Sequence, residues 1–126
     1  MSNRLFLKSC LQNELPATIA IINAIPTEKF DYRPHPDSRS AYEIAEHIIA
    51  HAYDFGVILN NASCDECLIM PFKDAKEGTG LLAGYWQKAI EMLDRLDENE
   101  FDKTNVELLV SGKPLVTLPR AGMMWF

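Results

Sequence analysis

The sequence has no long apolar run and no excess of positive charge. It contains 12 Lys+Arg against 18 Asp+Glu, a formal net charge of −6 over 126 residues. No apolar run approaches the roughly 18 residues that span a bilayer, and the N-terminus lacks the apolar stretch of a signal peptide. Nucleic acids and anionic membranes bind basic surfaces, so we expect no nucleic-acid or membrane partner. We expect a cytoplasmic protein.

Cysteine is scarce and odd in number. Cys10, Cys64 and Cys67, in a chain with no export signal, argue against a disulfide framework. Cys64 and Cys67 have the CxxC spacing of a zinc knuckle or a redox pair. A tetrahedral zinc site needs two further ligands, and a thioredoxin-like motif needs a strand-to-helix junction in an α/β fold. We therefore interpret them as two loop cysteines and rank a zinc or redox function last.

Glycine-rich catalytic motifs are also missing. The sequence contains no GxGxxG, no Walker loop and no GxSxG, which argues against nucleotide enzymes and serine hydrolases. What is present is ordinary for a globular protein, with 48% apolar and 24% charged residues. This length and composition predict a single domain over residues 1–126.

Apolar residues at helical spacing predict three long helices. The first covers residues 3–24, where Pro16 predicts a kink or a break into two pieces. The proline-rich segment 26–40 predicts an ordered loop with one turn at 27–30. Ser40 and Glu43 form a capping box that starts a second helix running to about Asn60. A long connection over 61–78 precedes a third helix, which begins at Thr79 and ends near residues 97–102.

Residues 106–126 carry two signals. Residues 106–110 and 115–118 flank Ser111-Gly112-Lys113-Pro114, which predicts a hairpin or an extended turn. Thr117 and Pro119 then resemble a helix start, and large apolar residues follow at 123–126. We expect a fourth helix that is truncated in this chain, either because the sequence is a fragment or because a dimer covers this end.

The second predicted helix carries the most informative side chains. Glu43, His47, His51 and Asp54 share one flank of its apolar face. Two histidines at i and i+4 can bind one metal ion, and Glu43 or Asp54 could orient a ring or act as a base. The alternative, which spacing alone favours, is a pair of half-buried histidines with acidic neighbours. The metalloprotease motif HExxH is absent, and His35, between two prolines, is expected to be exposed and without a role.

Two stretches carry a resemblance to a known family. Ile25-Pro-Thr-Glu-Lys-Phe-Asp-Tyr-Arg-Pro34, followed by Arg39-Ser-Ala-Tyr-Glu-Ile-Ala-Glu-His-Ile48, resembles the DinB-like superfamily of small metalloenzymes. Tyr85-Trp86 and Met124-Trp125-Phe126 are similar too, so the resemblance covers essentially the whole chain. It implies an all-α fold, an up-down four-helix bundle with an open metal site. It assigns one ligand to His47, with His51 an additional histidine, and two ligands to last-helix histidines that this sequence does not contain.

Two functional hypotheses follow. In the first, the chain is a DinB-like metal-dependent enzyme of the hydrolase or thiol-dependent transferase type. Its divalent ion would be zinc or nickel, its metal residues His47 and His51, and its substrate a small molecule or a low-molecular-weight thiol. In the second, it is a catalytically silent helical domain that acts as a homodimer or an interaction module. Metal retention by the purified chain distinguishes the two hypotheses.

Overall fold

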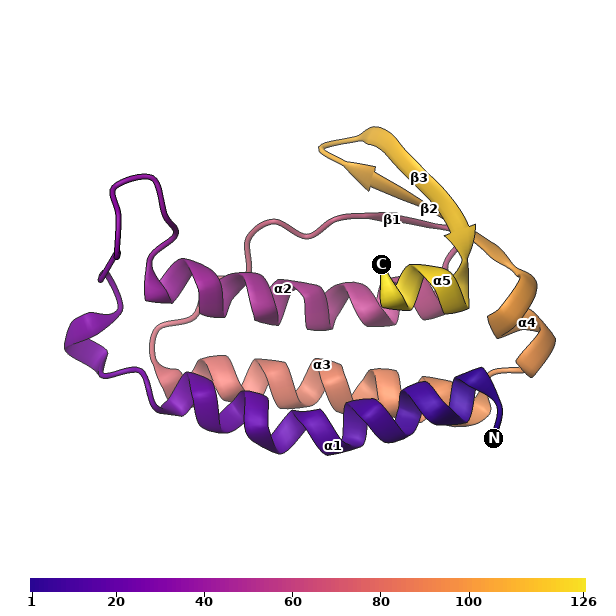
Figure 1. The fold of residues 1–126 in the computed structure, drawn as a ribbon, viewed down its shortest axis with the longest axis horizontal. Coiled ribbons are helices and arrows are strands. Elements are labelled where there is room, and N and C mark those ends of the chain that lie inside the picture. The colour runs from indigo at the N-terminus through magenta and orange to yellow at the C-terminus, as the bar shows by residue number, and fades with distance from the viewer.

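Three long helices lie side by side, and a small sheet covers one of them (Figure 1). The computed structural model describes residues 1–126, with five α-helices, one 3-10 helix and a three-stranded sheet. In chain order the elements are α1 (Asn3–Asn23), the 3-10 helix η1 (Thr27–Lys29), α2 (Ala41–Asn60), β1 (Ser63–Asp65), α3 (Ala75–Arg95), α4 (Glu98–Lys103), β2 (Asn105–Val110), β3 (Lys113–Pro119) and α5 (Arg120–Trp125).

Helix α3 is the centre of the helical layer. It packs against both α1 and α2, and its buried face includes Leu82, Trp86 and Leu93. The indole Nε1 of Trp86 donates to the carbonyl of Leu11 on α1 at 2.9 Å. Helix α1 continues through Pro16 without interruption, so the alternative of two shorter helices is wrong. Packing of the apolar face outweighs the one backbone donor that proline lacks.

The predicted start of α2 is confirmed and that of α3 is not. The Ser40 hydroxyl accepts from the Glu43 backbone N–H, the Glu43 carboxylate accepts from the Ser40 N–H, and α2 ends at Asn60 as expected. Helix α3 begins at Ala75, four residues before the predicted start, because the Asp74 side chain caps it. Gly78, expected to end the connection, is buried inside the helix.

The sheet corrects the predicted fold class. β1 pairs parallel with β2, and β2 pairs antiparallel with β3. The expectation of an all-α four-helix bundle with a truncated fourth helix is therefore wrong, and the fold is α+β. Of the two alternatives for 106–118 the hairpin is confirmed. Ser111 and Gly112 have φ of 52° and 76°, and two positive φ values are what a two-residue hairpin turn of type I′ requires.

A second, smaller core lies between the sheet and the end of α2. Its buried members are Ile58, Cys64, Val106 and Met123. Thr117 and Pro119 pair with β2, so α5 begins at Arg120 and not at Thr117. The buried Arg120 guanidinium donates to the carbonyls of Ile58 and Asn61, which holds α5 against the C-terminal end of α2.

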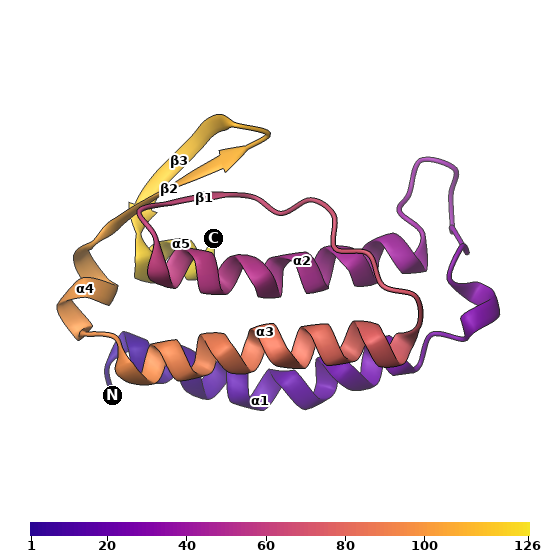
Figure 2. The ribbon, with the colours of Figure 1, turned by 180° about the vertical axis from the view of Figure 1, so that it is seen from behind.

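The segment between α2 and α3 returns along the outer side of α2. From β1 it runs back over the helix towards the start of α3, so that α2 lies between this segment and the other long helices (Figure 2). This path brings residues just after β1 close to the middle of α2. None of the helices combines the length and the apolar character that crossing a lipid bilayer requires.

Candidate metal centre

His47 and His51 lie one turn apart on α2 and face each other. Their Nε2 atoms are 2.9 Å apart. The ring centroids are 4.2 Å apart and the ring planes are nearly perpendicular, at 82°. The helix geometry that places i and i+4 on one face accounts for the contact. The sequence prediction that these two histidines lie together is thus met by the structure.

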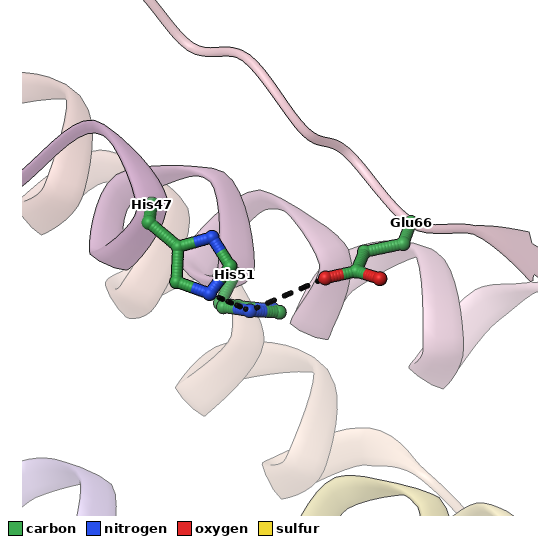
Figure 3. Close-up of side chains that lie close together, drawn as sticks. All are labelled: His47, His51 and Glu66. Atoms are coloured by element: carbon green, nitrogen blue, oxygen red, sulfur yellow. Dashed lines mark hydrogen bonds and ion pairs between the residues drawn. The ribbon is translucent and has the colours of Figure 1, made fainter. Parts of the chain in front are cut away.

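A third donor comes from the returning segment. The Oε1 atom of Glu66 lies 3.6 Å from Nε2 of His51. One ligand atom from each of His47, His51 and Glu66 can be chosen so that all three lie within 4.8 Å of one another (Figure 3). All three residues are partly buried. Two imidazoles and a carboxylate thus converge on one point beside α2.

Backbone contacts on both sides fix the position of Glu66. Its own N–H donates to the carbonyl of Leu109 on β2 at 2.8 Å, which extends the parallel β1–β2 pairing by one residue. The N–H of Cys67 donates to both carboxylate oxygens of Asp54 on α2, at 3.1 Å each. The segment is therefore bonded to the sheet on one side and to the helix on the other.

Asp54 contacts His51 on the ring nitrogen that does not face His47. Its side chain is only 4% exposed, and its Oδ2 lies 3.6 Å from Nδ1 of His51. A carboxylate on the second ring nitrogen of a metal-binding histidine fixes the ring orientation and leaves the other nitrogen free for the ion. The contact thus leaves Nε2 of His51 facing His47 and Glu66.

The two histidines have opposite pKa shifts. Asp54 raises the pKa of His51, and Glu66 adds to this effect. Burial lowers the pKa of His47, and the neighbouring His51 lowers it further. A 2.9 Å contact between ring nitrogens needs one proton between them, and these directions favour His51 over His47 as the ring that carries it.

The other sequence candidates lie elsewhere or play no part. Glu43, considered as a base, is occupied by the capping box and by both terminal nitrogens of Arg33, at 2.9 and 2.7 Å. His35 is exposed, as expected, with 69% of its side chain accessible. Glu66 was missed because it lies in a connection without periodicity, and only the pairing of β1 with β2 brings it to the helix.

The cysteines take no part in the centre. Cys64 in β1 is buried, and burial raises the pKa of its thiol to about 12, with Asp54 adding to the effect. Burial also raises the pKa of Cys67, whose Sγ donates to the carbonyl of Ile69. Metal binding and redox exchange both need a thiolate, so these environments argue against a metal or redox role. The expectation of two loop cysteines holds for Cys67, whereas Cys64 lies in β1.

An apolar groove of about 440 Å³ begins at the histidine site. Its polar lining is confined to His51, Asp54 and Glu66. The other seven lining residues are apolar and come from α2, the hairpin and α5: Phe55, Ile58, Leu108, Leu115, Met123, Met124 and Phe126. The groove therefore has one polar end and otherwise apolar walls.

The donor set fits a transition-metal ion. Two nitrogens bound to one ion at about 2.0–2.1 Å lie roughly 2.9–3.4 Å apart for bond angles between about 90° and 109°. The observed separation of 2.9 Å lies within this range. The Glu66 carboxylate is near enough to complete a three-residue set of the His₂Glu type, which leaves coordination positions free for a substrate.

No family model, no curated protein and no solved structure matches this chain. The resemblance to the DinB-like superfamily therefore stays a prediction from the sequence. The geometry around His47 and His51 carries the functional argument that follows.

Proposed function

We propose that this chain is a divalent-metal-dependent enzyme whose ion is held by His47, His51 and Glu66. The observation that carries the proposal is the convergence of these three donors within 4.8 Å. It differs from the ligand set that the DinB-like resemblance implies, because the carboxylate of Glu66 takes part and all three ligands come from residues 47–66. The resemblance supports the same broad class of activity, a hydrolase or a thiol-dependent transferase.

The residues around the centre have separable roles. When bound, a divalent ion supplies Lewis-acid activation of a carbonyl group or a water molecule. Asp54 holds the His51 ring through Nδ1, and the Cys67 N–H fixes Asp54 in turn. The groove supplies a surface of low polarity next to the reacting position, where electrostatic effects are stronger than in bulk water.

Zinc and nickel are the ions that suit this donor set best. Imidazole nitrogens bind zinc, nickel, copper and iron, whereas magnesium and calcium prefer sites built from oxygen donors. A single carboxylate beside two imidazoles is common in catalytic zinc sites. We therefore retain zinc or nickel as the proposed cofactor.

Metal content is the direct test. The chain is washed with a chelator, dialysed against zinc or nickel, and measured by elemental analysis beside His47→Ala, His51→Ala and Glu66→Gln. We expect about one equivalent in the parent chain, little in either histidine variant and weakened binding in Glu66→Gln. His35→Ala is the matched control, because His35 is exposed in a distant loop. A parent chain without metal would overturn the proposal.

An exposed aromatic pair favours a second candidate function, self-association. Phe6 on α1 and Trp125 on α5 contact each other with ring centroids 6.0 Å apart, yet they are 53% and 55% exposed. Exposed apolar patches mark interaction surfaces. We propose a homodimer that covers this pair. Sedimentation of the parent chain and of Phe6→Ser at micromolar concentration tests it, with a monomeric parent chain as the contrary result.

A further inference from the structure

We propose that the groove beside the histidine site binds a small amphiphile, namely a medium-length apolar chain with one anionic oxygen-donor head group. The head group would lie at the metal and the chain along the apolar walls. This inference rests on the proposed function for the head group, and it deepens that function by naming the class of ligand. The placement of the groove, its lining and the charge of the centre support it.

Polar and apolar residues are separated along the groove. Its polar lining residues, His51, Asp54 and Glu66, all belong to the candidate centre. Beyond them the walls are apolar and come from elements far apart in the sequence, α2 on one side and the hairpin and α5 on the other. A ligand that fills this space must therefore be apolar along most of its length and polar at one end only.

The size of the groove limits the ligand. A volume of about 440 Å³ lies towards the lower end of the about 300–1,000 Å³ typical of small-molecule pockets. It suits one acyl chain or one ring system. Met123 and Met124 form part of the wall. Their flexible thioether side chains can adapt to ligand tails of different shape.

The charge of the centre selects the head group. Among the direct ligands, two neutral imidazoles and the Glu66 carboxylate would leave a divalent ion with one positive charge, which an anionic oxygen donor at a free coordination position would neutralise. Without the ion, the same head group would meet the carboxylates of Glu66 and Asp54 at the polar end and would be repelled. Binding of the head group should therefore depend on the metal ion, whereas binding of the ligand's apolar tail should not.

The test uses probes that separate the contribution of the head group from that of the apolar tail of the ligand. The zinc-loaded protein is titrated calorimetrically with octanohydroxamate and with acetohydroxamate, which share a head group. We expect octanohydroxamate to bind at least about a hundredfold more tightly, because its six additional methylenes are buried in the groove. Leu115→Asp on β3 should remove most of this difference. Ile21→Asp on α1 is the control, since Leu115 and Ile21 are 60% and 63% exposed.

A second readout does not need the metal. The methionine methyl groups are followed by NMR in the metal-free chain during addition of 1-octanol, which has no metal-binding head group. Shifts confined to Met123 and Met124 are expected. Met92, which lines a smaller hollow of about 190 Å³ between α2 and α3, should not move.

The outcomes distinguish the two proposals. Octanol shifts at Met123 and Met124 in a chain that binds no zinc would overturn the metal function and support the apolar site. Zinc binding with equal affinities for the two hydroxamates, and no methyl shifts, would overturn the apolar site and leave the metal function in place. Shifts spread over all methionines would also overturn the inference.

Discussion

The Nε2 atoms of His47 and His51 lie 2.9 Å apart, a separation that allows one proton between them and not two. A metal ion bound at this position must displace that proton. The raised pKa of His51 keeps the proton in place to a higher pH than an ordinary histidine would. Metal binding and protonation thus compete for the same lone pairs.

The first prediction is that zinc binding weakens as the pH falls through the raised pKa of His51, and that zinc binding below this pKa releases protons. Calorimetry in two buffers of different ionisation enthalpy measures the number released. His35→Ala should release the same number, because His35 lies outside the centre. Binding that is independent of pH between 5 and 8 would contradict the competition.

The second prediction concerns Asp54, which contacts His51 on the ring nitrogen away from the proposed metal position. Asp54→Asn keeps an acceptor for the Cys67 N–H but removes the charge beside Nδ1 of His51. We expect zinc affinity to fall about 10–100-fold, with the stoichiometry unchanged. Asp37→Asn is the matched control, because Asp37 and His35 form a similar pair that is exposed in a loop. Equal affinities in the two variants would show that Asp54 has no positioning role.

The third prediction follows from the high pKa of Cys64. A thiol with a pKa of about 12 is thiolate to only about one part in 10⁴ at pH 8. Iodoacetamide should therefore leave Cys64 unmodified in the folded chain and label it in urea, with Cys67 labelled faster than Cys64 in the folded chain. Peptide mass spectrometry measures both rates.

Replacing both cysteines of the CxxC pair tests the zinc-knuckle alternative directly. The double variant Cys64→Ser, Cys67→Ser should retain the zinc stoichiometry of the parent chain. Loss of metal in this variant, with retention in His47→Ala, would favour the cysteine site.

The fourth prediction compares two glycines of α3. A Cβ added at Gly78 would lie 2.9 Å from Cδ2 of Phe72, whose buried ring is stacked on Tyr42 and cannot easily move. Gly78→Ala should therefore destabilise the fold by about 1–3 kcal/mol. Nothing lies within 4 Å of a Cβ at Gly80, so Gly80→Ala should stabilise the helix by about 0.5–1 kcal/mol. Urea denaturation measures both, and effects of the same sign would contradict the packing argument.

The fifth prediction concerns acid stability. Hydrogen bonds from Arg33 and from the Ser40 N–H lower the pKa of Glu43 below its ordinary value of 4.5. A carboxyl group whose pKa is lower in the folded state stabilises that state above its unfolded pKa, and this stabilisation is lost as the pH falls through the folded pKa. Glu43→Gln, which can keep the capping bond, should therefore lower Tm at pH 7, and this effect should shrink as the pH falls through the lowered pKa of Glu43.

Circular dichroism melts from pH 3 to 7 measure this difference. Glu91→Gln on the exposed side of α3 is the control, because Glu91 makes no ion pair in the structure. A Tm difference between parent and Glu43→Gln that does not change with pH would contradict the assignment.

The sequence predicts the helices well where a local signal marks them. The capping box at Ser40 sets the start of α2. The start of α3 is missed because glycine is typical of a helix break, which placed Gly78 in the connection. The structure shows instead that the Phe72 ring packs too closely on Gly78 to leave room for a Cβ. β1 has three residues, too few to show any periodicity, and its partner is more than forty residues away.

The candidate site was likewise predictable only where a local pattern marks its residues. His47 and His51 share a helix, so their spacing alone places them together. Glu66 lies 15 residues beyond His51, and no local pattern links the two. Its position depends on the Leu109 carbonyl and on Asp54, which are contacts of the folded chain.

The parallel pairing of β1 with β2 also sets the order in which the centre can assemble during folding. Helix α2 can bring the two imidazoles together within about a microsecond, since helix formation is local. The third donor has to wait until residues 105–110 have closed a loop of more than forty residues onto the β1 segment, a slower event. Early in folding the chain therefore offers two ligands, and full coordination would report that the sheet has formed.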